Sequence, residues 1–199
     1  MARTPIHNRQ DALENAMALF WRKGFHATSL KDLEHALDMR PGSIYATFGS
    51  KDALFQEALE RYAERGQAEV SRIFAAHASP MAGLTAYIRG LGEIRDKGLP
   101  CPSCMLVKSL MELGDREQNA RQRVEALLAG MEGLFVEQLR AAQAAGELAK
   151  TEDVTLLGRR LQSEVMGLRT FAQRNVSSEQ ISHMAHAMAE TWQSLQRSH

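Results

Sequence analysis

Cysteine, proline and long apolar runs are all scarce in this sequence. Only two of the 199 residues are cysteine and five are proline, which excludes a disulfide-stapled secreted domain and a low-complexity chain. No apolar run approaches the roughly 18 residues of a membrane span, and the first residues lack the apolar core of a signal peptide. We therefore expect a globular, cytoplasmic protein with no membrane partner.

An excess of charge of either sign is also missing. The chain has 24 basic and 24 acidic residues and a formal net charge of +0 at pH 7, so it does not coat nucleic acid through bulk charge. Any DNA binding must come from the local placement of basic residues. A chain of 199 residues buries about 70% of its unfolded surface, so it needs neither a metal nor a disulfide framework to fold. We also expect no cofactor.

Apolar residues recur at three- and four-residue steps along almost the whole chain, which is the pattern of amphipathic helices. No stretch alternates at period two with β-branched enrichment, so the sequence predicts no strand. We predict an all-α fold of about nine helices. The second expected helix is about ten residues long and begins at the Ser29 cap. The other expected ranges are about 11–23, 41–48, 51–76, 81–97, 103–113, 118–145, 153–173 and 178–195.

Capping residues mark the first three helices. Ser29 and Asp32 have the spacing of a capping box, Pro41 suits the first turn of the third helix, and Ser50 is placed to cap the fourth. Two short helices joined by a tight turn, with a helix packed across both, form a helix-turn-helix. In that motif the second short helix lies in the major groove, with its N-terminal residues at base edges. Here that helix is Pro41–Phe48.

Two segments of this region resemble a known family. The run Thr28-Ser-Leu-Lys-Asp-Leu, followed by Gly42-Ser-Ile-Tyr-Ala-Thr-Phe-Gly-Ser-Lys-Asp-Ala-Leu-Phe55, resembles the DNA-binding domain of the TetR family of transcriptional repressors. The resemblance covers about residues 8–55 without a gap. It implies a helix-turn-helix DNA-binding domain over 1–50, a helical effector-binding and dimerisation domain over 51–199, and a regulator rather than an enzyme. Its expected partners are a double-stranded DNA operator and a second copy of the chain.

The sequence departs from the family pattern at two positions. The family usually has glycine in the turn and serine or threonine before the third helix, and here those positions hold Asp38 and Arg40. Aspartate tolerates a left-handed conformation better than most residues, so we expect the turn to survive. Arg40 is placed for a bidentate contact to guanine. The full set of expected DNA-contacting residues is Thr28, Arg40, Pro41, Gly42, Ser43, Tyr45, Ala46, Thr47 and Lys51.

Three of these residues have a competing structural role. The Tyr45 ring can pack while its hydroxyl reaches a phosphate, as the family pattern implies. A lysine such as Lys51 is more often a solvated surface residue, but at a helix start the dipole opposes a cation, which favours a nearby anion such as a phosphate. Thr28 suits either a helix cap or a phosphate contact.

Operator recognition implies a homodimer, because one recognition helix reads only a few base pairs and specific sites pair two copies. The last two predicted helices are the candidates to form a four-helix bundle between subunits, as the resemblance also implies. Part of each apolar stripe must face its own core. The expected interface residues are Leu161, Val165, Leu168, Met184, Met188 and Trp192.

The middle helices carry apolar, adaptable side chains that can line a pocket for a small-molecule effector, which the family resemblance implies. Plain core packing explains these side chains equally well. The candidate pocket residues are Leu84, Ile88, Met105, Met131, Phe135 and Met166. His183 and His186 have a spacing that metals use, but they lack a third ligand, so we expect no metal site.

The two cysteines form the pair Cys101-Pro-Ser-Cys104, at the junction of a loop and a predicted helix. A helix N-terminus favours the thiolate, and a second thiol can resolve an oxidised cysteine into a disulfide. We therefore consider both a sensor of oxidants or electrophiles and two buried structural cysteines. One alternative function is a helical thiol oxidoreductase, which does not need Thr28, Tyr45 and Lys51 at their spacings. The other is a helical interaction protein without DNA binding, which predicts no salt-dependent affinity for any duplex.

Overall fold

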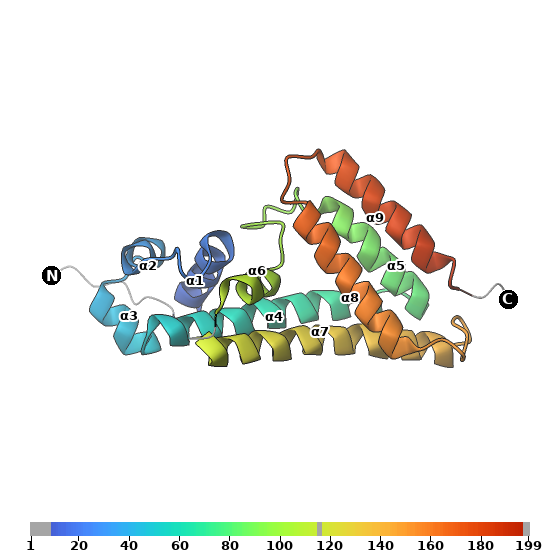
Figure 1. Ribbon diagram of the computed structural model, residues 1–199, viewed down its shortest axis with the longest axis horizontal. Coiled ribbons are helices and arrows are strands. Elements are labelled where there is room, and N and C mark those ends of the chain that lie inside the picture. Colours follow the sequence, from blue (N-terminus) through green and yellow to red (C-terminus); the bar gives the residue numbers. More distant parts are fainter. Residues whose placement is uncertain (1–8, 115–116, 197–199) are drawn as a thin grey trace. The chain divides into compact units, whose positions relative to one another are not determined.

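A computed structural model describes residues 9–114 and 117–196, and those residues form only helices and their connections (Figure 1). Within them the prediction of an all-α fold with nine α-helices is confirmed. The helices are α1 (Arg9–Lys23), α2 (Leu30–Leu37), α3 (Pro41–Phe48), α4 (Lys51–Ala75), α5 (Pro80–Gly90), α6 (Met105–Glu112), α7 (Gln118–Ala144), α8 (Val154–Phe171) and α9 (Ser178–Gln193), with a 3₁₀ turn, η1 (Leu91–Glu93), after α5.

Local chemistry sets the ends of the first helices. Gly24 follows α1 with φ +89°, a conformation that favours glycine. The Ser29 side chain accepts from the Asp32 backbone N–H and the Asp32 carboxylate accepts from the Ser29 backbone N–H, so the predicted capping box is confirmed. The Ser50 hydroxyl accepts from the Ala53 N–H at 3.0 Å, as expected for the cap of α4.

The prediction of one helix over 81–97 is wrong in its second half. The α-helix ends at Gly90, and the chain tightens into η1. A Cβ at Gly92 would lie 2.9 Å from the Ser182 Cα on α9, so the backbones approach here at a distance that only glycine allows. The close approach to α9 is a tertiary feature, which helical periodicity does not reveal.

The chain divides into two compact units. Unit 1 comprises residues up to Glu64 together with Met105–Glu125, and unit 2 comprises Arg65–Cys104 and the residues from Ala126 onward. The division differs from the boundary expected after residue 50, because the start of α4 belongs to the core of unit 1. The Phe55 ring packs against Phe20 and Phe25, with centroid distances of 5.1 and 4.7 Å.

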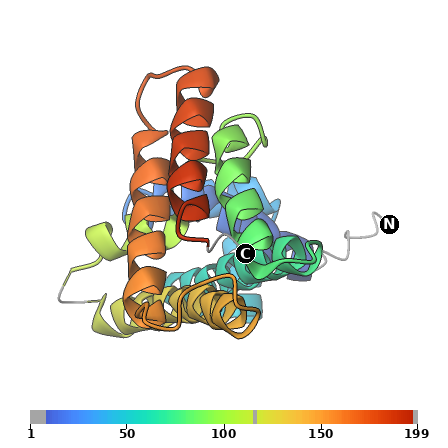
Figure 2. The same cartoon turned by 90° about the vertical axis from the view of Figure 1, so that its right-hand side faces the viewer.

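Unit 2 has its own apolar core, in which α9 lies against α5 and α8 (Figure 2). Trp192 is fully buried there, and its indole N–H donates to Glu164 Oε2 at 2.6 Å. Glu147 accepts from the Ser79 hydroxyl and the Met81 N–H, and so caps the N-terminus of α5. Among the described helices, none is long and apolar enough to cross a membrane.

Four of the six residues expected at the dimer interface are instead part of this core, so that prediction is wrong for them. Their side chains are already buried inside their own chain and are not exposed for contact with a second subunit. The four are Leu161, Val165, Leu168 and Trp192. Met188 is half-buried and Met184 is 40% exposed, so these two keep their predicted role as interface candidates.

The expected pocket residues divide between the two units. Leu84, Ile88 and Phe135 are fully buried in the core of unit 2, and Met131 packs against that core. Met166 of unit 2 is half-buried, whereas Met105 is buried in unit 1. These positions agree with the core-packing interpretation, and their role in effector binding stays a prediction.

Candidate nucleic-acid interface

The turn between α2 and α3 depends on Asp38. This residue has φ 51° and ψ 40°, and its N–H donates to the Glu34 carbonyl. It is the one non-glycine residue with positive φ among the described residues. Aspartate tolerates the left-handed region because its short polar side chain bonds locally. The expectation that the turn survives without glycine is therefore confirmed.

Two apolar side chains hold α3 in place. Ile44 and Phe48 are buried, at 0% and 4% exposure, and they lie four residues apart on one face of the helix. The opposite face carries Gly42, Ser43, Tyr45 and Ala46, which are exposed to solvent, and the half-buried Thr47. A short helix anchored along one side and bare along the other has the form of a recognition helix.

The outer face of α3 carries small and polar side chains. Tyr45 is 44% exposed, and Ala46 beside it is exposed as well. The Thr47 hydroxyl donates to the Ser43 carbonyl at 2.7 Å, so its proton is used within the helix. A Cβ added at Gly42 would meet no described atom within 4 Å, so internal packing gives no reason for glycine at this position.

The N-terminus of α3 leaves Arg40 available. Arg40 is the N-cap residue in an extended conformation, its side chain makes no capping hydrogen bond, and Pro41 follows in the first turn. The guanidinium is exposed, while the Arg40 carbonyl accepts from the backbone of Ser43 and Ile44. The backbone is thus fixed by the helix, and the exposed cation lies at the helix N-terminus.

Lys51 begins α4, and its ammonium group lies over the Phe25 ring, 4.4 Å from the centroid. This cation–π contact is a stabilising interaction that the sequence does not reveal. Burial lowers the pKa of Lys51, and the charges of Asp52, Glu112 and Asp32 oppose that shift. The ammonium is therefore partly desolvated and close to the dipole of α4, an environment in which an added anion is favourable.

Thr28 does not have the accessible hydroxyl that a phosphate contact requires. The residue is completely buried, and its Oγ1 donates to the Gly24 carbonyl at 2.5 Å. Its N–H is also used, in a bond to the Phe25 carbonyl. The expected phosphate contact is therefore wrong for this side chain, and the α2 cap is Ser29 instead.

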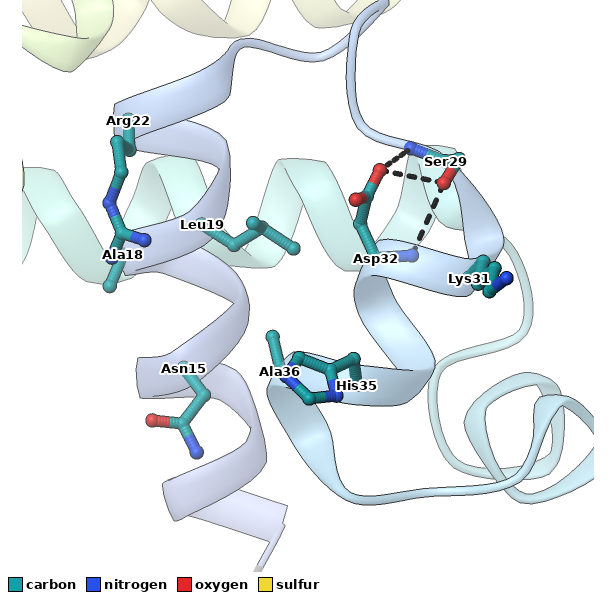
Figure 3. Close-up of a pocket in the computed structure, with 9 residues that line it drawn as sticks. All are labelled: Asn15, Ala18, Leu19, Arg22, Ser29, Lys31, Asp32, His35 and Ala36. Atoms are coloured by element: carbon teal, nitrogen blue, oxygen red, sulfur yellow. Dashed lines mark hydrogen bonds between the residues drawn. The ribbon is translucent and has the colours of Figure 1, made fainter.

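A cleft of ≈ 620 Å³ lies between α1 and α2, and sequence reasoning did not find it (Figure 3). Its lining includes the cations Arg22 and Lys31 and the ring of His35. Asp32 also lines it, but this carboxylate accepts from Lys23 at 2.6 Å and from the Ser29 hydroxyl. Those hydrogen bonds, first from Lys23 and then from Ser29, hold the pKa of Asp32 well below its usual range.

The cysteine pair lies in unit 2, in the segment directly before α6. Neither thiol is part of a disulfide, and the more buried of the two, Cys101, accepts from Gln173 Nε2 at 2.9 Å. Cys104 is half-buried and immediately precedes Met105, the first residue of α6. The prediction that the pair sits where a loop meets a helix is confirmed.

The backbone between the two thiols is held by α8. Arg169 Nε donates to the Pro102 carbonyl at 3.1 Å. Nearby, burial raises the pKa of Tyr87 to about 12, with the charges of Arg169 and Cys104 acting in opposite directions. In the described residues no group of three or more histidine, cysteine or acidic side chains is arranged to hold a metal.

Family models match both parts of the chain. Residues 12–58 match the model for bacterial regulatory proteins of the tetR family, and residues 80–190 match the tetracyclin repressor-like C-terminal domain. The chain belongs to the TetR family. It is therefore a helix-turn-helix, DNA-binding transcriptional regulator and not an enzyme, so the oxidoreductase alternative is wrong.

Individual members of the TetR family resemble the chain over nearly its whole length. It is 28% identical over 195 residues to the HTH-type transcriptional repressor ComR of Escherichia coli (strain K12), which covers 97% of this chain and 92% of ComR. A cysteine mutant of the TetR-family regulator CifR, complexed with 26-base-pair operator DNA, has a TM-score of 0.86 and 27% identity over 96% of this chain and 100% of its own.

The reduced form of NemR from E. coli shares the fold of this TetR-family chain. Its TM-score is 0.80 at 20% identity, over 92% of this chain and 95% of NemR. At that identity the likeness concerns the fold alone.

Proposed function

We propose that the protein is a dimeric transcriptional repressor that binds a palindromic operator in the cytoplasm through α3 of each subunit. The observation that carries the proposal is the two-sided character of α3. Ile44 and Phe48 fix one side in the core, and the other side presents exposed residues beside two cations. ComR is named as a repressor, and CifR binds operator DNA, which supports this role.

Each exposed residue has a contact that suits its chemistry. Arg40, at the positive end of α3, has the bidentate geometry that reads guanine in the major groove. Tyr45 is exposed enough for its hydroxyl to reach a phosphate, and a phosphate satisfies the partly desolvated Lys51. Gly42 lets the helix approach the DNA closely. We assign the remaining contacts to Pro41, Ser43, Ala46 and Thr47.

A second copy of the chain is needed to read two half-sites. Among the described residues of α8 and α9, the large apolar side chains left exposed are Leu156, at 63%, and Met184, at 40%. A Cβ at Gly167 of α8 would meet no described atom within 4 Å, so that part of α8 offers a smooth surface for a close approach. We propose that the exposed sides of α8 and α9 form the dimer interface.

Selection of bound duplexes from a random pool tests the proposal, because the enriched sequence reports both symmetry and half-site spacing. We expect a palindrome with half-sites about one helical turn, or a multiple of it, apart. Fluorescence anisotropy with that duplex then tests Arg40→Ala, which should lose roughly 1–3 kcal/mol and relax preference at one base pair. Arg123→Ala, which removes an ion pair with Glu60, is the matched control. Enrichment of no palindrome contradicts the proposal.

For the effector, we propose that a small molecule or modification of the Cys101 and Cys104 thiols releases the DNA. Cys104 is the better first target, because Cys101 is buried and bonded to Gln173. Diamide tests this version: it takes up two electrons and two protons as two thiols become a disulfide. Release in the wild type but not in Cys101→Ser/Cys104→Ser supports it. Equal release in both proteins leaves a noncovalent ligand as the effector.

A further inference from the structure

Helix α6 binds the end of α1 through a lysine. Lys108 Nζ donates to the Trp21 carbonyl at 2.8 Å and to the Arg22 carbonyl at 3.1 Å. Both carbonyls belong to the last turn of α1, where helical carbonyls lack partners within the helix. A cation at this end of a helix also interacts favourably with its dipole. All three residues belong to unit 1.

One turn further along α6, a carboxylate binds the segment that follows α1. Glu112 Oε2 accepts from the Phe25 N–H at 2.9 Å, and Oε1 accepts from the His26 N–H at 2.6 Å. A Cβ at Gly24 would lie 2.7 Å from Glu112 Oε2, so the carboxylate occupies the space that glycine leaves open. Hydrogen bonds to an ionised acceptor are roughly twice as strong as neutral ones.

The segment held in this way is the connection between α1 and the helix-turn-helix. The Gly24 carbonyl accepts from Thr28 Oγ1, and the Phe25 ring contacts both Phe55 and the Lys51 ammonium. A shift of this connection therefore moves the start of α2. It also changes the environment of Lys51, which we propose binds a phosphate. Neither the capping box nor the apolar core of α3 fixes the Phe25 and His26 N–H groups.

We propose that Lys108 and Glu112, the α6 clamp, are positioning residues that hold the α1–α2 connection in the geometry that operator binding requires. The clamp does not touch DNA. It raises affinity by keeping the DNA-binding unit in one arrangement, because the apparent affinity falls with the fraction of molecules in the competent state. The inference rests on the proposed function, since it concerns how α2 and α3 are presented to DNA.

Three variants of the full-length protein test the clamp, with affinity measured on the operator that the wild type selects. Glu112→Ala removes both backbone acceptors, and we expect about a tenfold loss of affinity, on the scale of 1.4 kcal/mol per factor of ten. Glu112→Gln keeps one acceptor, so its loss should be intermediate. Lys108→Met keeps the aliphatic stem and removes the two bonds to α1. Glu60→Gln, in a different ion pair of unit 1, is the matched control and should bind like the wild type.

Two readouts separate positioning from a general loss of stability. The dependence of log affinity on log salt should keep its slope in all variants, because the number of phosphate contacts is unchanged. Hydrogen exchange should become faster at the Phe25 and His26 amides in Glu112→Ala, while the amides of α8 and α9 keep their protection.

Each outcome decides the proposal. Wild-type affinity in Glu112→Ala, or unchanged exchange at Phe25 and His26, overturns the clamp. A loss of affinity that accompanies faster exchange throughout the protein overturns it too, because the role is then structural. If the wild type itself selects no duplex, the proposed function fails first, and the clamp's role in DNA binding fails with it.

Discussion

Unit 1 and unit 2 are both built from amphipathic helices, but they use their exposed faces differently. In unit 1 the short helix α3 buries Ile44 and Phe48 and leaves its opposite face exposed, with Arg40 directly before the helix and Lys51 at the start of α4. In unit 2 most apolar side chains of α8 and α9 are buried in the core of their own chain, and Trp192 is fully buried. A stripe of apolar residues on a helix therefore predicts that the residues are buried. Whether they are buried in the core of their own chain or in a subunit interface depends on which element packs against them.

The largest expected effect of a single substitution is in unit 2. Trp192→Ala removes a fully buried ring and leaves Glu164 without its indole donor, so we expect a loss of about 3–5 kcal/mol in the free energy of unfolding. Urea denaturation measures it. Thr191→Ala, at an exposed neighbour, should stay within about 0.5 kcal/mol of the wild type. A small effect at Trp192 would contradict its burial in the core of unit 2.

A smaller effect, on DNA affinity rather than folding, is expected at Lys51. Lys51→Met keeps the apolar contact with Phe25 but removes the cation, so the slope of log affinity against log salt should fall by about 1. Lys150→Met, at an exposed lysine of unit 2, should leave the slope unchanged. Titrations of the operator at several salt concentrations measure both. An unchanged slope for Lys51→Met removes this residue from the phosphate contacts.

The α2 capping box should make the stability of unit 1 depend on pH in the acid range. The folded-state pKa of Asp32 lies below its unfolded value because Lys23 and Ser29 bond the carboxylate. The stabilisation is therefore present above the unfolded pKa of about 3.9 and is lost as pH falls through the folded one. Asp32→Asn should be less stable than the wild type at neutral pH, and the difference should shrink below about pH 4.

Urea denaturation across the acid range measures this difference between Asp32→Asn and the wild type. Lys23→Met is a useful companion, because it removes the ion pair while leaving the Ser29 bonds in place. The stability difference between Lys23→Met and the wild type should be smaller, and it should also disappear as pH falls. A gap between Asp32→Asn and the wild type that stays constant with pH would contradict the assignment of the shift to the folded state.

The smallest expected effect is at the turn before α3. Asp38 adopts φ 51°, so Asp38→Gly should raise stability by about 0.5 kcal/mol, since relief of the left-handed strain slightly exceeds the entropy cost of glycine. Asp38→Ala should lower it by about 1 kcal/mol. Urea denaturation of the two variants gives opposite signs if this interpretation holds. Two destabilised variants would show that the Asp38 side chain itself supports the turn.

The helices and their caps were largely predictable because their signals are local. Ser29 with Asp32, Pro41 and Ser50 mark helix starts within four residues of sequence, and the structure confirms each. The end of α5 was not predictable, because it is followed by a close approach of the Gly92 backbone to α9, which is a tertiary contact. For the candidate site, the recognition helix followed from its motif, but the buried hydroxyl of Thr28 did not. The family spacing specifies a position and not the environment of its side chain.

The sequence by itself determined the helical fold, the helix-turn-helix and the position of the cysteine pair beside a helix start, because periodicity, capping and motif spacing act over short stretches of chain. Tertiary structure alone decided that Leu161, Val165, Leu168 and Trp192 are core, that Lys51 lies over Phe25, and that Glu112 binds the Phe25 and His26 amides. These features join residues far apart in the chain, so their energies depend on three-dimensional packing that no local pattern encodes.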